Sequence, residues 1–137
     1  MSKIKDLIPL IKEALDNNQE FILPINGTSM QPFLRNNDYV YLTIPNNLKH
    51  NDIILYQRNE EEFVLHRIVK QKDNYYVLMG DHQLIEEFPI YKEQVVAKVT
   101  KVRKNNKELS LKGIKYNLYL FFIKFKLFRK LLLKLGK

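Results

Sequence analysis

Three side chains in this 137-residue chain have the types that a serine nucleophile requires. Ser29 lies in the stretch GTSMQP, His66 in VLHRIV and Asp81 in MGDHQ. A serine hydroxyl is a poor nucleophile at neutral pH, so it needs a base within hydrogen-bond reach and a third group that orients the base. Each residue also has an ordinary interpretation, as a turn serine, a strand histidine and a Gly-Asp turn. The residue types alone are therefore compatible with acyl-transfer chemistry but do not establish it.

Composition narrows the chemistry further. The chain contains no cysteine, which excludes disulfides, thiolate-bound zinc and a cysteine nucleophile. Its length is most simply that of one domain with a core of its own. A Ser-His mechanism needs no metal and no cofactor, so we expect neither.

The elements that must position these residues are mainly strands. Apolar residues at helical spacing predict a helix within residues 1–18, which we expect to lie on the body and to be interrupted or shortened by Pro9. Residues 20–104 predict a β-body, because short β-branched and aromatic runs alternate with breaks that contain Asn, Asp, Lys or Gly. These runs are DYVYLTI, DIILYQ, EFVLHRIVK, NYYVLMG and QVVAKVTKVR. The pattern predicts a β-rich α+β domain with an antiparallel sheet of the sandwich or coiled type.

Charge separates this body from a basic tail, residues 105–137. Residues 1–97 hold 10 basic and 14 acidic side chains, whereas residues 98–137 hold 13 and 1. At about 100° per residue the tail forms an amphipathic helix. Its apolar face comprises Ile114, Leu118, Phe121, Phe125, Phe128, Leu132 and Leu135, and its basic face Lys115, Lys126, Arg129, Lys130 and Lys134.

This tail has two equally supported interpretations. A basic helix with a broad Phe/Leu face can lie on an anionic membrane through residues 113–137, or it can pack on the β-body. Nucleic acid is disfavoured as a partner because of the aliphatic density. The tail has no run of 18 uncharged apolar residues, so it is a poor transmembrane helix. The amino terminus lacks the pattern of a secretory signal. We therefore expect a cytoplasmic or peripherally membrane-associated protein.

The sequences of several segments, taken in order, resemble those of a known protein family. GTSMQP, followed in order by NDIILYQ, VLHRIV, VLMGDHQ and VVAKV, resembles the catalytic domain of the signal peptidase I family of serine endopeptidases. The resemblance runs from about Leu23 to Val102, and Gly-x-Ser-Met-x-Pro and Gly-Asp are its most specific parts. It implies a single peptidase-like domain over residues 1–104, with a coiled antiparallel sheet. The family's amino-terminal membrane anchor and its Asp-Ser-Arg sequence after Gly-Asp have no counterpart in this chain.

The resemblance also implies roles for individual residues. Ser29 is expected to attack a peptide carbonyl. His66 stands where bacterial members commonly have a lysine base. A histidine in this position resembles the archaeal and endoplasmic-reticulum branch, in which an acid supports a Ser-His pair. Asp81 matches the supporting acid of that branch, with Glu86 and Glu87 as alternative acids. The Ser29 N–H would stabilise the oxyanion, Gly27 would allow close approach of the substrate chain, and Thr28 could add a hydroxyl.

The expected function is cleavage of a leader, signal or precursor peptide. Two alternatives remain open. A non-catalytic β-module would bind peptides along an edge strand and would not need Ser29. A self-cleaving repressor would carry a related β-domain, but about twenty residues before the β-region are too few for a helix-turn-helix unit.

Overall fold

The computed structural model describes residues 4–111, 114–123, 130 and 134. The helices are α1 (Ile4–Asp16), the short 3₁₀ helix η1 (Lys92–Gln94) and α2 (Ile114–Ile123). The strands are β1 (Phe21–Pro24), β2 (Tyr39–Thr43), β3 (Ile53–Gln57), β4 (Phe63–Gln71), β5 (Tyr76–Met79), β6 (Glu87–Ile90), β7 (Val95–Lys104) and β8 (Lys107–Ser110). The prediction of a β-rich α+β domain is confirmed.

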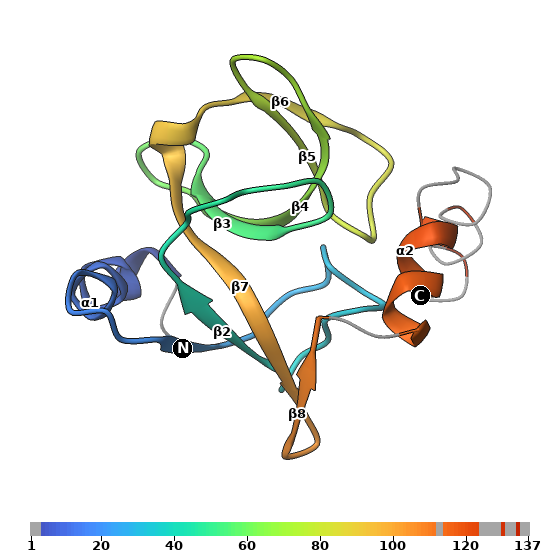
Figure 1. Cartoon of the computed structure of the whole chain (residues 1–137), viewed down its shortest axis with the longest axis horizontal. Helices are drawn as coiled ribbons and strands as arrows, with labels where there is room; N and C mark the ends of the chain where they lie inside the picture. Colours follow the sequence, from blue (N-terminus) through green and yellow to red (C-terminus); the bar gives the residue numbers. More distant parts are fainter. Residues whose placement is uncertain (1–3, 112–113, 124–129, 131–133, 135–137) are drawn as a thin grey trace.

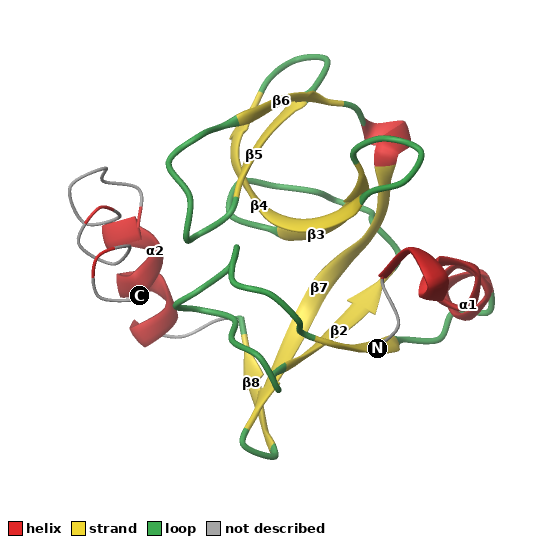
Figure 2. Cartoon of the chain, turned by 180° about the vertical axis from the view of Figure 1, so that it is seen from behind, coloured by secondary structure: helices red, strands yellow, loops and turns green. Residues whose placement is uncertain are grey.

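All eight strands belong to one antiparallel sheet, with the order β1-β2-β7-β3-β4-β5-β6 and with β8 paired to β7. The long strand β7 joins the two halves of this sheet, because it pairs with β3 near its start and with β2 and β8 further along. Strands β3 to β6 curl together at one end of β7, while β2 and β8 meet its other half (Figure 1) and β1 lies beyond β2. Helices α1 and α2 lie on opposite sides of the sheet, as the reverse view also shows (Figure 2).

Two apolar clusters fill the sheet's two halves. The first packs α1 against β1, β2, β7 and one face of β3 and β4, and the second lies within the curl of β3 to β6. Strand β4 contributes to both, because successive side chains of a strand point to opposite faces. Leu65 belongs to the first cluster and Ile68 to the second.

Helix α1 continues through Pro9 rather than ending there. The prediction that Pro9 interrupts or shortens this helix is therefore wrong. Pro9 lies on the exposed face and removes one backbone N–H, the one that would bind the Lys5 carbonyl. Burial of Ile8, Ile11 and Leu15 against the sheet outweighs that loss, because the stability of a helix in a protein comes mostly from packing of its apolar face.

Five strands were predicted, and β1, β6 and β8 were not. Each of these three has only four residues, too few for a recognisable alternation. Strand β6 also contains Pro89. A proline argues against a strand when only the sequence is considered, but it is tolerated at the edge of a sheet. Strand β8 lies within the predicted tail, so the start of that segment extends the sheet.

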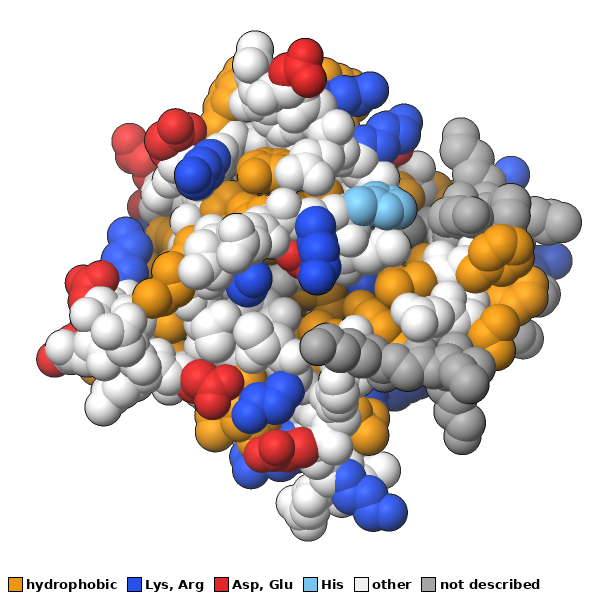
Figure 3. Space-filling model, in the orientation of Figure 1, with side chains coloured by type: hydrophobic (Ala, Val, Ile, Leu, Met, Phe, Trp, Pro, Cys, Tyr) orange, Lys and Arg blue, Asp and Glu red, His pale blue; other side chains and the backbone are white. Residues whose placement is uncertain are grey.

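The described part of the tail packs partly on the body. Tyr116 and Tyr119 of α2 contact body residues and Ile123 is buried, whereas Leu118, Phe121 and Phe122 are exposed. Apolar side chains accordingly gather on the surface of α2 (Figure 3). The rest of the predicted apolar and basic faces, from Phe125 onward, lies largely outside the described residues. Membrane contact through residues 113–137 stays a prediction. Within the described ranges, no helix combines the length and the apolar character that crossing a membrane demands.

We predict that Leu42→Ala destabilises the fold. Leu42 is fully buried in the first apolar cluster, so its truncation should lower the free energy of unfolding by about 2–5 kcal/mol. Ile44, two residues further on, is 41% exposed, and Ile44→Ala should change that free energy by less than about 0.5 kcal/mol. Urea unfolding followed by circular dichroism measures both. Equal losses in the two variants would contradict the assigned packing.

Candidate active site

Ser29 lies in the loop between β1 and β2, and Gly27 shapes that loop. Gly27 has φ of 108°, a conformation that side chains disfavour, and its N–H donates to Asn36 Oδ1 at 2.9 Å. A Cβ at Gly27 would meet nothing within 4 Å. The glycine is therefore required by backbone geometry, while the open space above it is compatible with the expected approach of a substrate chain.

The Ser29 backbone is held by the turn after β5. The His82 N–H donates to the Ser29 carbonyl at 3.0 Å, and a Cβ on Gly80 would lie only 2.4 Å from the same oxygen. No larger residue fits at position 80 without moving the loop. The Gly-Asp sequence thus brings the predicted Asp81 segment against the predicted nucleophile segment.

His66 is almost completely buried on β4, and its Nδ1 lies 3.2 Å from the Tyr56 hydroxyl. The single hydroxyl proton of Tyr56 is donated to Glu87 Oε1 at 2.7 Å. The tyrosine oxygen can then only accept from His66, so Nδ1 carries the imidazole proton and Nε2 is left with its lone pair. This arrangement sets the tautomer that a general base needs.

Glu87 is itself anchored by Arg58, whose Nε and Nη2 donate to its two oxygens at 2.9 and 2.8 Å. Burial alone would raise the pKa of Glu87, but the hydrogen bonds from Arg58 and Tyr56 lower it. Burial and Glu87 raise the pKa of Tyr56, which stays a phenol. Burial lowers the pKa of His66 to about 4, against the opposing charge of Glu87. The imidazole is therefore neutral at pH 7.

Asp81 has a different set of partners. It is fully buried in a two-point ion pair with Arg67, with Nε to Oδ1 and Nη2 to Oδ2 both at 2.8 Å, and it accepts from the Tyr119 hydroxyl at 2.7 Å. The charge of Asp81 raises the pKa of His66, but by less than the charge of Glu87 does. Glu86 pairs with Lys70 at 3.2 Å. Glu87, one of the three acids named from the sequence, is joined to His66 by hydrogen bonds through Tyr56.

Sequence reasoning missed Tyr56, Arg58 and Arg67. Tyr56 stands two residues along β3 from Ile54, the register partner of His66, so it shares a face with that histidine. Had the β3–β4 pairing been drawn from the sequence, this spacing would have pointed to Tyr56. Arg67, directly after His66, gave no such signal because buried arginines are rare.

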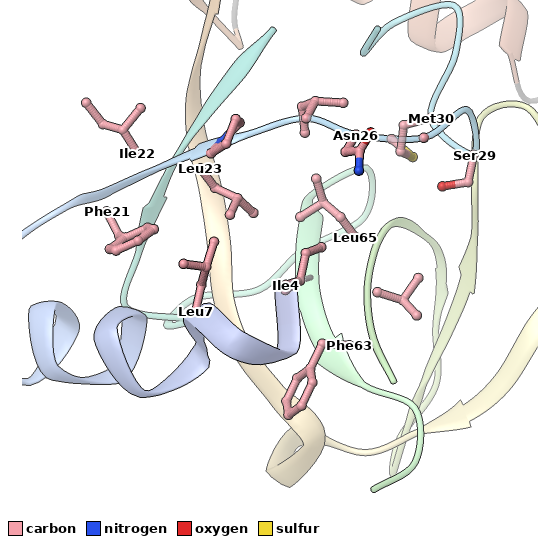
Figure 4. Close-up of a pocket in the computed structure, with 14 residues that line it drawn as sticks. Ile4, Leu7, Phe21, Ile22, Leu23, Asn26, Ser29, Met30, Phe63 and Leu65 are labelled. Atoms are coloured by element: carbon pink, nitrogen blue, oxygen red, sulfur yellow. The ribbon is translucent and has the colours of Figure 1, made fainter. Parts of the chain in front are cut away.

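Ser29 borders an apolar pocket of about 580 Å³ that opens between β1 and β4. Its lining comes from α1, β1 and the start of β4, and includes Leu7, Phe21, Leu23, Phe63 and Leu65. Ser29 lies at one end of this pocket, with its hydroxyl turned toward the interior (Figure 4). The described residues contain no hydrogen bond between Ser29 and His66. Such bonds often tighten only when substrate is bound.

Two strand edges face the pocket. Strand β1 pairs with β2 alone among the described strands, and residues 63–66 of β4 pair with β3 but lie outside the β4–β5 register. Their backbone groups on the pocket side are thus available to an extended chain. Neither the Ser29 N–H nor the Thr28 hydroxyl makes a hydrogen bond in the described structure. Both are free to face a carbonyl oxygen.

No group of three His, Asp or Glu side chains is arranged to hold a metal ion within the described residues.

Comparison with known proteins gives one match. The family model described as Peptidase S24-like matches residues 1–103, which include β1 to β6, all but the last residue of β7 and every candidate site residue. Neither a search of curated proteins nor a search of solved structures found a match to this chain.

We predict that His66 titrates near pH 4 rather than near its reference value of about 6.5. The unfolded chain then binds a proton at higher pH than the folded chain does. His66 should therefore destabilise the fold progressively as pH falls from about 6.5 to about 4. Nuclear magnetic resonance of the imidazole carbons measures the pKa directly, and urea unfolding of wild type and His66→Asn measures the linked loss. Titration of His66 near 6.5 would contradict its burial behind Tyr56.

Proposed function

Because the chain belongs to the peptidase S24-like family, a family of serine peptidases, we propose that it is a serine endopeptidase whose nucleophile is Ser29. The observation that carries this proposal is the position of Ser29 at the end of an apolar pocket, between two open strand edges. The family assignment supports peptide hydrolysis in general. The proposed substrate is a leader, signal or precursor peptide, as the resemblance to signal peptidase I implies.

The open edges of β1 and β4 support binding of the substrate as an added strand. Main-chain hydrogen bonds to a sheet edge give affinity, and pockets for alternate side chains give specificity. A peptide laid along residues 21–27 would run toward Ser29, which follows directly in the chain. This placement brings the scissile carbonyl to the hydroxyl and to the Ser29 N–H.

His66 is the proposed base. Its Nε2 takes the Ser29 proton as the oxygen attacks the carbonyl carbon, and it returns that proton to the leaving amine. The imidazolium that forms between these steps is stabilised by Glu87 through Tyr56, with both hydrogen bonds already in place. We therefore propose that Glu87, rather than Asp81, supports the base. The low pKa of His66 keeps it ready to accept a proton at neutral pH.

The pocket's lining supports a substrate with large apolar side chains. Leucine and phenylalanine side chains from three elements face its interior, so a charged substrate residue would lose its hydration without gaining a partner. The volume of about 580 Å³ also exceeds the space that a single alanine needs. We propose a peptide that carries Leu, Ile or Phe on the amino-terminal side of the cleaved bond.

Self-cleavage is the second candidate, because the family assignment does not distinguish it from cleavage of another chain. Intact mass after prolonged incubation of pure protein separates the two. Fragments that form at a rate independent of protein concentration indicate self-cleavage. A stable mass together with peptide turnover indicates a peptidase that acts on other chains.

We predict that a fluorophosphonate probe labels wild type at Ser29 and that Ser29→Ala abolishes both labelling and peptide cleavage, because the covalent step requires the hydroxyl. Ser110→Ala is the matched control, since Ser110 is an exposed serine on β8. It should keep both activities. Mass spectrometry of labelled peptides and a quenched-fluorescence assay measure the two outcomes.

Two results would overturn this proposal. Cleavage by Ser29→Ala at the wild-type rate would exclude Ser29 as nucleophile. Peptide binding by a wild type that neither cleaves nor takes up the probe would indicate a non-catalytic β-module.

We predict that Leu7→Asn weakens substrate binding. Leu7 lines the pocket from α1, so a polar side chain there should raise KM for a leucine-containing peptide roughly tenfold, as the loss of one apolar contact would. Leu10→Asn, on the same helix but 54% exposed and away from the pocket, should leave KM unchanged. Equal KM values in the two variants would place the peptide elsewhere.

A further inference from the structure

Helix α2 reaches the loop of the candidate nucleophile through aromatic contacts. Phe33, four residues after Ser29, lies 5.1 Å from the Tyr116 ring and 5.6 Å from the Tyr119 ring, measured between centroids. The same three rings surround the Arg67 guanidinium, at 5.4 to 5.9 Å from its central carbon. The helix thus closes over a buried charge next to the site.

The two tyrosine hydroxyls complete the hydrogen bonding of that charge. Arg67 Nη1 donates to Tyr116 at 2.7 Å, and Tyr119 donates to Asp81 Oδ2 at 2.7 Å. Arg67 and Asp81 have no exposed side-chain surface. A buried ion pair is tolerated only where further hydrogen bonds satisfy its remaining donors and acceptors. Helix α2 therefore supplies contacts that the pair needs in order to keep one geometry.

From Asp81 the contacts continue to Ser29. Asp81 stands between Gly80, which is packed against the Ser29 carbonyl, and His82, whose N–H donates to that carbonyl at 3.0 Å. A shift of the Asp81 side chain would tilt this turn and move the Ser29 backbone with it. Catalysis is sensitive to such shifts, because misplacement by about 1 Å can cost about a hundredfold in rate.

These tyrosines lie beyond the part of the chain that matches the family, which ends at residue 103. The body therefore receives this support from a segment outside the matched residues. We propose that α2 is a clamp whose residues Tyr116 and Tyr119 act as positioning residues for Ser29, through Arg67 and Asp81. This proposal rests on the proposed peptidase function. It assigns to Asp81 a role in holding the nucleophile loop.

Removal of one hydroxyl tests the clamp. Tyr119→Phe keeps the ring against Phe33 but removes the bond to Asp81. We expect the rate constant of fluorophosphonate labelling and kcat to fall roughly tenfold, the size of effect that a lost hydrogen bond to a charged group produces, with KM unchanged. Tyr39→Phe is the control, because the Tyr39 hydroxyl makes no hydrogen bond in the described structure. It should label at the wild-type rate.

Amide hydrogen exchange gives a readout that does not depend on activity. The His82 N–H should exchange about tenfold faster in Tyr119→Phe than in wild type, and equally fast in Tyr39→Phe. If wild type takes up no probe, the peptidase proposal fails, and the exchange rate of His82 still decides whether α2 holds the loop.

A lower melting temperature in Tyr119→Phe, with labelling and His82 exchange both unchanged at temperatures where the protein is folded, would overturn the clamp. If Tyr119→Phe does not fold, Tyr116→Phe takes its place in both measurements. It removes the bond to Arg67 Nη1, which also binds the Asn51 carbonyl. Wild-type labelling and exchange in that variant would likewise overturn the proposal.

Discussion

The buried ion pair between Arg67 and Asp81 is the constraint on which the site depends. Burial alone would lower the pKa of Arg67, but Asp81 raises it, so the guanidinium is charged inside the protein. Removing either partner would leave an uncompensated buried charge, which is far more costly than losing the pair. The turn after β5, the strand β4 and the helix α2 must therefore all meet at one point. The Ser29 loop is fixed because it lies against that turn.

Three successive residues of strand β4 lie in three different environments. Leu65 enters the first apolar cluster and lines the pocket, His66 turns to Tyr56, and Arg67 turns to Asp81. Because side chains alternate along a strand, a shift of one residue in the β3–β4 register would exchange these environments. A shift in one direction would place Arg67 beside Tyr56 and His66 in the position of Leu65 within the first apolar cluster. The apolar residues on both sides of this stretch prevent such a shift, since it would expose both clusters.

The sequence predicted the long strands and the segments of the site, but not the connections between its side chains. The runs that became β2, β3, β4, β5 and β7 have β-branched and aromatic residues in sufficient length to be recognised. The four-residue strands depend on their neighbours, and so does helix α1, where tertiary packing outweighed Pro9. Asp81 was named as the acid because it follows glycine, whereas its partner Arg67 was overlooked. The resemblance to signal peptidase I is supported only at the level of a wider superfamily of serine peptidases, because the family model that matches is the S24-like one.

His66 is neutral at pH 7 and so can accept a proton, but its low pKa makes it a weak base. A pKa of about 4 leaves His66 as the neutral imidazole at neutral pH, yet proton transfer is most efficient when the pKa of the base lies near the working pH. The structure offsets part of this mismatch with Glu87, whose charge favours the imidazolium through Tyr56. Arg58 keeps Glu87 ionised but opposes the imidazolium by its own charge. Because binding of a peptide in the adjacent pocket would exclude water, these fixed charges would act more strongly on the proton transfer in the complex than in the free protein.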